Sequence, residues 1–181
     1  QLKKEPTQDI NKDSKYIVAI GRLTKQKNLI FLINAFSETI TETNNIKLLI
    51  IGSGEEEKKI KNLIITKKLQ NRVILKKYTK NIFNYLNNSI FFVMSSLWED
   101  PGFVIIEAAI CNKLILSSDV DSGPNEFIDN NKNGILFKSN DKKDFIKKMH
   151  SITSIDKNIL LKKMISAKYE AKNYTIFSHY K

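Results

Sequence analysis

The chain has 181 residues, with 30 Lys and Arg against 19 Asp and Glu, a formal net charge of +11 and one Cys. This length predicts one globular domain, and a single Cys excludes an internal disulfide and favours a reducing compartment. No run approaches the roughly 18 apolar residues of a membrane span, and the polar first fifteen residues do not resemble a signal peptide. We therefore expect a chain that does not cross a membrane.

The positive charge comes almost entirely from lysine, because 28 of the basic residues are Lys and only two are Arg. The lysines are scattered in pairs such as Lys58-Lys59 and Lys162-Lys163, at positions expected to face solvent on helices. This dispersion favours a solvated surface. Binding to nucleic acid or to an anionic membrane is the alternative that the charge leaves open.

Short apolar runs alternate with amphipathic stretches along the chain. A strand at 16–20 is followed by a helix over 28–40, and a strand at 47–51 ends at a Gly-Ser-Gly turn that leads into a helix opened by three Glu. The later elements are a strand at 73–75, a brief helix near 82–86, strands at 90–94, 114–116 and 134–137, and helices over 101–111, from Asp141 to 152, and over 156–171.

Strands that alternate with helices predict an α/β fold with a doubly wound, parallel, six-stranded sheet of the Rossmann-like kind and a helical C-terminal tail. In the strand order 3-2-1-4-5-6, the first and fourth strands are neighbours whose connections leave in opposite directions. Ligands bind at that point, beyond the carboxyl ends of the strands. The loops 21–28 and 95–102 should therefore face each other across the binding site.

The first of these loops carries Arg22 and Lys27. Arg22 is one of two Arg among 30 basic residues, which indicates a task for a planar, bidentate cation such as binding a diphosphate. Lys27 could add a point charge to the same anion. The alternative is that Arg22 caps a turn and Lys27 is solvated.

Two carboxylates accompany the second loop. Glu107 is the only charged residue between positions 101 and 111, so we expect its helix to be buried nearly all round and the carboxylate to need a partner. That partner is either a nearby Lys such as Lys113 or a ligand hydroxyl. Glu99 either points into the crevice or is a solvated loop acid.

Other patterns are weak. The Gly-Ser-Gly at 52–54 is not the dinucleotide fingerprint, no P-loop occurs, and neither His has metal-ligand spacing. Tyr78, Trp98 and Phe103 could stack on a base or sugar, but aromatic residues at strand ends more often belong to the core.

Several motifs in order resemble the C-terminal, nucleotide-binding domain of glycosyltransferase family 4, the retaining group 1 family with the two-domain GT-B fold. They are G-R-L-x-x-x-K-N at 21–28, G-x-G at 52–54, the E-x7-E pair Glu99 and Glu107, the stretch 118–126, and Asn-Gly at 133–134. Each is weak alone, and together they are specific.

The resemblance implies that Arg22 and Lys27 hold the diphosphate of a nucleotide-sugar donor and stabilise the leaving nucleotide. Glu99 would contact the transferred sugar, and Glu107 would accept hydrogen bonds from ribose hydroxyls. The resemblance implies that Glu99, Arg22 and Lys27 are the catalytic residues. The donor site that it implies is formed by Gly21, Arg22, Lys27, Glu99, Gly102, Phe103 and Glu107.

The backbone N–H groups of Gly102 and Phe103 would help at the start of their helix. The resemblance implies no metal and no other cofactor, because the two cations take the role of a divalent ion. Three positions depart from the family pattern: Asp100-Pro101 replaces Gly-Phe, Leu114 replaces a common Pro, and Asp121-Ser122 replaces Gly-Gly. The first change puts the identity of the sugar in doubt.

The family enzymes need a second domain that binds the acceptor, so we expect this chain to be a fragment with little activity alone. Residues 1–15 would be the linker or hinge from a missing N-terminal domain, residues 16–155 the donor-binding domain, and residues 156–181 helices that cross back toward the missing domain.

The expected function is sugar transfer from a nucleoside diphosphate sugar to an acceptor hydroxyl, in polysaccharide or glycoconjugate synthesis. The alternatives are a GT-B sugar-nucleotide epimerase and a non-catalytic basic module that binds anionic lipid or nucleic acid. We expect a cytoplasmic protein, with peripheral contact at the inner face of the membrane left open, and no specific nucleic-acid partner.

Overall fold

The computed structural model describes residues 15–39, 45–99 and 102–174. Six strands form one parallel sheet in the order β3-β2-β1-β4-β5-β6, which confirms the predicted fold class and topology. The strands are β1 (Tyr16–Ile20), β2 (Lys47–Ile51), β3 (Val73–Lys76), β4 (Phe91–Met94), β5 (Leu114–Asp119) and β6 (Ile135–Lys138).

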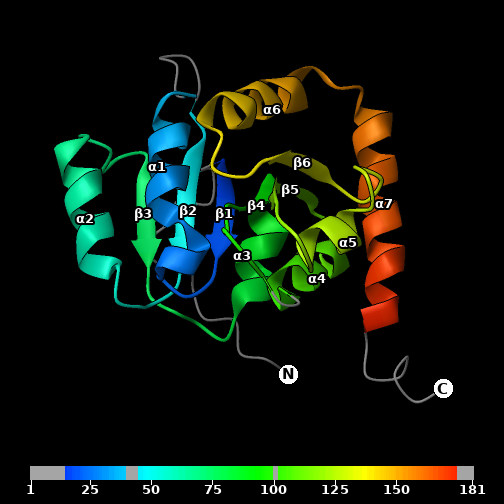
Figure 1. Cartoon of the computed structure of the whole chain (residues 1–181), viewed down its shortest axis with the longest axis horizontal. Coiled ribbons are helices and arrows are strands. Elements are labelled where there is room, and N and C mark those ends of the chain that lie inside the picture. The colour runs from blue at the N-terminus through cyan, green and yellow to red at the C-terminus, as the bar shows by residue number, and fades with distance from the viewer. Residues whose placement is uncertain (1–14, 40–44, 100–101, 175–181) are drawn as a thin grey trace.

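Helices cover both faces of the sheet (Figure 1). Helices α1 (Leu29–Ser37), α2 (Glu57–Thr66) and α6 (Lys142–Ser154) pack on one face. The other face carries α3 (Ile82–Asn88), α4 (Phe103–Ile110) and α5 (Pro124–Ile128). Helix α7 (Lys157–Ala171) contributes to both cores, with Leu160 and Met164 packed against the first and Ala167 and Ala171 in the second. Two short 3-10 turns lie at η1 (Lys25–Lys27) and η2 (Lys172–Tyr174). The sequence did not predict α5 or the 3-10 turns.

The sheet is apolar on both faces because alternate side chains of each strand enter two separate cores. In β1, Ile17 and Ala19 join the core under α1, α2 and α6, whereas Val18 joins the core under α3, α4 and α5. Strands buried in this way are near-continuous apolar runs, which is why the sequence located them well.

Helix α6 begins as predicted, because the Asp141 side chain caps it by accepting a hydrogen bond from the Asp144 backbone N–H at 3.0 Å. Helix α7 packs against α4 and β5, and its Ala167 and Ala171 are fully buried. Residues 1–14 of the expected linker 1–15, and the end of the C-terminal segment, 175–181, lie outside the described residues.

The expectation that α4 is buried nearly all round is wrong. Phe103 is 64% exposed and Ile110 is 46% exposed, while Ile105, Ala108 and Ala109 are buried against the sheet. The helix therefore has an apolar side that does not enter the core, and its first residue lies at the mouth of the cavity described next.

Candidate functional site

A cavity of about 570 Å³ lies beyond the carboxyl ends of β1, β2 and β4, beside the first turn of α4. This is the position predicted from the topological switch between β1 and β4. All seven residues predicted for the site line it, namely Gly21, Arg22, Lys27, Glu99, Gly102, Phe103 and Glu107.

Direct hydrogen bonds join the loop after β1 to the loop after β4. The Leu97 backbone N–H donates to the Gln26 carbonyl at 2.8 Å, and the Gln26 side chain donates to the Trp98 carbonyl at 2.9 Å. The Ser95 hydroxyl donates to the Lys27 carbonyl at 2.8 Å. The two loops therefore form one bonded wall of the cavity.

Two glycines after β2 let the loop after β1 approach closely. A Cβ atom on Gly52 would lie 1.9 Å from the Gly21 carbonyl oxygen, and one on Gly54 would lie 2.5 Å from the Leu23 carbonyl oxygen. The Leu23 backbone N–H donates to the Ser53 carbonyl at 3.0 Å across the same contact. The Gly-Ser-Gly turn thus fixes the loop that carries the predicted arginine.

Lys27 and Glu99 form an ion pair at the base of the cavity. The Glu99 side chain is 4% exposed and that of Lys27 is 15% exposed. The alternatives in which Lys27 is solvated and Glu99 is a solvated loop acid are therefore wrong. The Ser96 hydroxyl also donates to the Glu99 carboxylate.

Arg22 lines the cavity with an exposed side chain, and it does not share the ion pair that Lys27 makes. Within residues 15–39, 45–99 and 102–174, its guanidinium forms no hydrogen bond or ion pair. The five donors of the side chain are therefore available to an anion in the cavity.

Glu107 is half-buried on α4 and lines the cavity. The proposed pair with Lys113 is wrong, because the Lys113 ammonium donates instead to the carbonyls of Asn87 at 2.9 Å and Ser89 at 3.0 Å. Among the described residues, Glu107 has no side-chain hydrogen bond or ion pair. Burial raises the pKa of its carboxyl group.

The aromatic residues near the cavity are not core residues, contrary to the interpretation favoured above. Tyr78 is 67% exposed, Trp98 55% and Phe103 64%, and Tyr78 and Phe103 line the cavity. Large apolar rings beside an open cavity suit a ligand with a flat or ring-shaped part.

The start of α4 lines the cavity through Gly102, Phe103 and Val104. Gly102 caps the helix with φ +72°, a conformation that favours glycine. The Ile105 N–H donates to the Gly102 carbonyl at 2.9 Å, whereas the N–H groups of Phe103 and Val104 precede the first bond inside the helix. The departure at Asp100-Pro101 lies outside the described residues. No group of three His, Cys, Asp or Glu that could hold a metal occurs in the described part of the chain.

Sequence reasoning missed the serines that support the site. Ser95 and Ser96 follow β4 directly, are buried, and bond to Lys27 and Glu99 as described above. The sequence does contain a sign of this role, because two hydroxyl residues follow an apolar strand directly. Buried polar side chains at such a position need hydrogen-bond partners.

Comparison with known proteins agrees with the fold. Residues 1–171 match the family described as glycosyl transferases group 1, so the chain belongs to that family. The chain is 42% identical over 132 residues to an uncharacterized glycosyltransferase of Methanocaldococcus jannaschii, covering 71% of this chain and 32% of the relative.

The chain is also similar to proteins whose names state an activity. A poly(ribitol-phosphate) alpha-N-acetylglucosaminyltransferase of Staphylococcus aureus is 30% identical over 142 residues, which cover 78% of this chain and 29% of the relative. The solved structure of an S. aureus TarM mutant with Fondaparinux, alpha-GlcNAc-glycerol and UDP has a TM-score of 0.82 at 27% identity, covering 91% of this chain and 34% of that one. The chain thus spans about a third of the length of these relatives.

Structures with lower sequence identity share the same fold. Anabaena Alr3699/HepE, solved with UDP and glucose, has a TM-score of 0.79 at 20% identity, covering 92% of this chain and 46% of that one. The six-stranded, Rossmann-like sheet with its C-terminal helices matches the GT-B glycosyltransferases. In the described residues, no helix has the length and apolar character to cross a membrane.

Proposed function

We propose that this chain is the donor-binding domain of a retaining glycosyltransferase that moves a sugar from a nucleoside diphosphate to an acceptor hydroxyl. One observation carries the proposal. One cavity at the switch point of the sheet is lined by the Arg22 guanidinium and the half-buried Glu107 carboxylate, neither of which has a hydrogen-bond or ion-pair partner among the described residues. A cation for phosphate and an acceptor for hydroxyl groups are what a nucleotide requires.

Arg22 and Lys27 bind the diphosphate in this proposal. As the bond between the sugar and the diphosphate breaks, negative charge grows on the leaving oxygen, and the two cations stabilise it without a metal. The acceptor oxygen forms the new bond on the same face of the sugar, and its proton passes to the leaving phosphate oxygen. The N–H groups of Gly102 and Phe103 add a partial positive charge at the start of α4.

Glu99 and Glu107 have separate tasks. Glu107 accepts hydrogen bonds from the ribose, which explains why a carboxylate is kept at a site where burial disfavours its charge. Glu99 contacts the transferred sugar and pairs with Lys27 when the site holds no ligand. Donor binding therefore requires Lys27 to share or exchange its carboxylate partner.

Uridine diphosphate is the first nucleotide to test, because the TarM structure contains UDP and its sequence is 27% identical to this chain. The acceptor-binding half lies in a further N-terminal domain in this proposal, which fits a chain that spans about a third of its relatives. The S. aureus relative is a poly(ribitol-phosphate) alpha-N-acetylglucosaminyltransferase, which supports a role in polysaccharide or glycoconjugate synthesis.

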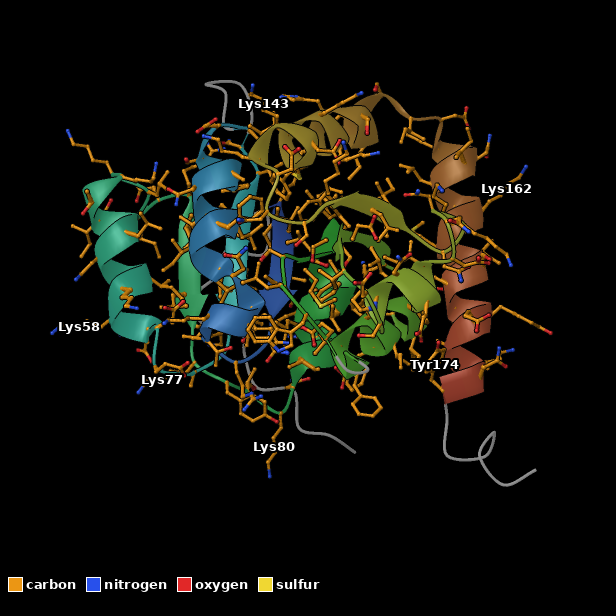
Figure 2. All side chains as sticks on the ribbon, in the orientation of Figure 1. Lys58, Lys77, Lys80, Lys143, Lys162 and Tyr174 are labelled. Atoms are coloured by element: carbon orange, nitrogen blue, oxygen red, sulfur yellow. The ribbon has the colours of Figure 1, made fainter. Side chains whose placement is uncertain are left out.

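A sugar-nucleotide epimerase is the enzyme alternative. It predicts that a full-length enzyme converts the donor sugar without an acceptor, whereas a glycosyltransferase requires one. A basic nucleic-acid module is less well supported, because the labelled Lys58 on α2, Lys143 on α6 and Lys162 on α7 project from separate helices, and Lys77 and Lys80 project from the loop after β3 (Figure 2). A nucleic-acid interface usually gathers its Lys and Arg on one face.

Cytoplasmic location with peripheral membrane contact is also part of the proposal, and α7 supports it. Leu161, Ile165 and Tyr169 follow one another at a spacing of four residues and are 49%, 57% and 71% exposed. At 100° per residue, this stripe lies between the exposed Lys162 and Lys168. An apolar stripe bordered by lysines suits an anionic lipid surface.

Titration with uridine and guanosine diphosphates, each with and without an attached sugar, tests the nucleotide proposal. We expect one of them to bind and to shift the backbone NMR signals near Arg22 and Glu107. Binding that is equal for all polyanions, that falls steeply with salt and that leaves those signals unchanged would instead indicate a basic module.

A further inference from the structure

The turn after β5 holds Ser122 in an unusual backbone conformation. Its φ is +73°, in the left-handed region that side chains other than glycine rarely adopt. A residue remains in such a conformation only where its surroundings hold it there. The Ser122 hydroxyl supplies one such contact, because it donates to the Glu99 carbonyl at 2.6 Å.

A second hydroxyl from the β5 region reaches the same loop. The fully buried Ser118, on β5 itself, donates to the Ser96 carbonyl at 2.6 Å. The segment from Ser96 to Glu99 is therefore held by β5 and its following turn at both ends. These two bonds cross 22 and 23 positions of sequence, so they are tertiary contacts and not part of a local turn.

The Glu99 carboxylate is held from another direction. Lys27 and Ser96 bind its carboxylate oxygen, whereas Ser122 binds its backbone carbonyl. Side chain and backbone are thus fixed independently. If the Ser122 bond to the Glu99 carbonyl is lost, the Glu99 carboxylate keeps its contacts with Lys27 and Ser96. The Glu99 backbone becomes more mobile, however, and so does the position of the carboxylate.

We propose that Ser122 is a positioning residue for Glu99 and that its hydroxyl sets how well the site holds the transferred sugar. This inference rests on the proposed function, in which Glu99 contacts the sugar while Arg22 and Glu107 contact the nucleotide. Loss of the hydroxyl should therefore weaken binding of a nucleotide sugar more than binding of the nucleotide alone. Ser122 is exposed, so its substitution leaves the core intact.

Two substitutions separate the hydroxyl from the backbone conformation. Ser122→Ala removes the hydrogen bond and keeps the strained φ, whereas Ser122→Gly removes the bond and relieves the strain. Ser154→Ala is the matched control, because the Ser154 hydroxyl donates to the Ser151 carbonyl at 3.0 Å on α6. Ser122→Asn is the conservative variant, since asparagine tolerates positive φ and retains a donor.

The 181-residue chain and these variants are titrated with UDP, UDP-glucose and UDP-N-acetylglucosamine by calorimetry. We expect Ser122→Ala and Ser122→Gly to reduce the affinity for the nucleotide sugar, relative to UDP, by about 3- to 10-fold, as for the loss of one neutral hydrogen bond. Ser122→Asn should recover part of that loss. Ser122→Gly should have a higher melting temperature than Ser122→Ala, because glycine relieves the backbone strain. An equal loss of affinity in these two variants would then come from the missing hydroxyl and not from lower stability.

Amide hydrogen exchange of residues 95–99 gives a readout that needs no ligand. Exchange should rise in both hydroxyl-deleted variants and stay at the parent level in Ser154→Ala. Unchanged exchange together with an unchanged affinity ratio overturns the inference. If the parent binds none of the nucleotides, the proposed function fails, and exchange at 95–99 still decides whether Ser122 fixes the Glu99 backbone.

Discussion

Lys27 and Glu99 lie 72 positions apart in sequence and form an ion pair that joins the loop after β1 to the loop after β4. The pair is largely shielded from water, with 15% and 4% of the two side chains exposed. Each group neutralises the other in the absence of a ligand. The same contact therefore stabilises the fold and keeps two functional groups of the proposed site in place.

Removing one partner of this pair should destabilise the fold. Lys27→Met or Glu99→Gln alone leaves a buried group without its partner, at a cost of about 3 kcal/mol in the free energy of unfolding. The double variant should lose clearly less than the sum of the two single variants. Urea denaturation measures all three.

The exposed pair Lys61–Glu57 on α2 provides the control. Its side chains are 57% and 29% exposed, so Lys61→Met should leave the free energy of unfolding close to that of the parent. Strict additivity of the Lys27 and Glu99 substitutions would show that the two residues do not interact in solution.

Arg22 should contribute to nucleotide binding and little to stability, because its guanidinium has no partner in the described residues. We expect Arg22→Ala to weaken UDP binding by about 10- to 100-fold, as for the loss of a charged hydrogen-bonding group. Arg22→Lys should be intermediate, since an ammonium cannot bind a phosphate with two parallel N–H groups. Calorimetry gives the affinity, and an unchanged affinity in both variants rejects Arg22 as a phosphate ligand.

Glu107 should make stability fall as pH rises. Burial raises its pKa in the folded state above the unfolded value of 4.5, so the folded chain binds the extra proton. The stabilisation is complete below pH 4.5 and is lost as pH rises through the folded pKa. Glu107→Gln should therefore melt above the parent chain at pH 7 and approach it at acidic pH.

The same substitution should weaken nucleotide binding, because an amide accepts hydrogen bonds from hydroxyl groups less strongly than a carboxylate. Glu55→Gln is the control, since Glu55 is exposed. It should leave both the melting temperature and the affinity close to those of the parent. A Glu107→Gln variant that is less stable at pH 7 would mean that the carboxylate has a structural partner.

Sequence patterns located the strands better than the loops, for a physical reason. Strands buried on both faces are apolar runs, and β1 and β2 match the prediction residue for residue. Strand β5 continues three residues further than predicted because Ser117, Ser118 and Asp119 pair with β6 through backbone groups that apolar patterning does not report.

The seven site residues share one cavity as predicted, because strand order alone brings the two loops together. Their partners could not be predicted. The ion pair of Lys27 with Glu99 and the hydroxyl contacts of Ser96 and Ser122 depend on loop conformations, and Ser122 adopts a positive φ that no residue-type preference indicates. The sequence also predicted too little exposure for α4, because apolar residues on a helix can line a cavity as well as a core.

Gly54 and Gly21 should respond differently to alanine. The new Cβ in Gly54→Ala would lie 2.5 Å from the Leu23 carbonyl, a backbone atom that cannot yield without moving the Arg22 loop. In Gly21→Ala it would lie 3.0 Å from Cε of Lys27, a side-chain atom that can shift by a few tenths of an ångström without moving the backbone. We expect Gly54→Ala to cost about 2 kcal/mol of unfolding free energy and to weaken UDP binding, and Gly21→Ala to cost less. Equal losses in denaturation experiments would contradict the close contact at Gly54.

The apolar stripe on α7 predicts binding to anionic membranes. Leu161→Ser combined with Ile165→Ser should reduce sedimentation with vesicles containing 30% phosphatidylglycerol by about tenfold, because two half-exposed apolar side chains no longer enter the lipid. Phosphatidylcholine vesicles and high salt should both weaken binding, since the flanking lysines act through charge. Ile65→Ser is the control, because Ile65 on α2 is 59% exposed and lies outside the stripe. An equal loss in Ile65→Ser would mean that dispersed lysines, and not α7, adsorb the protein to the vesicle.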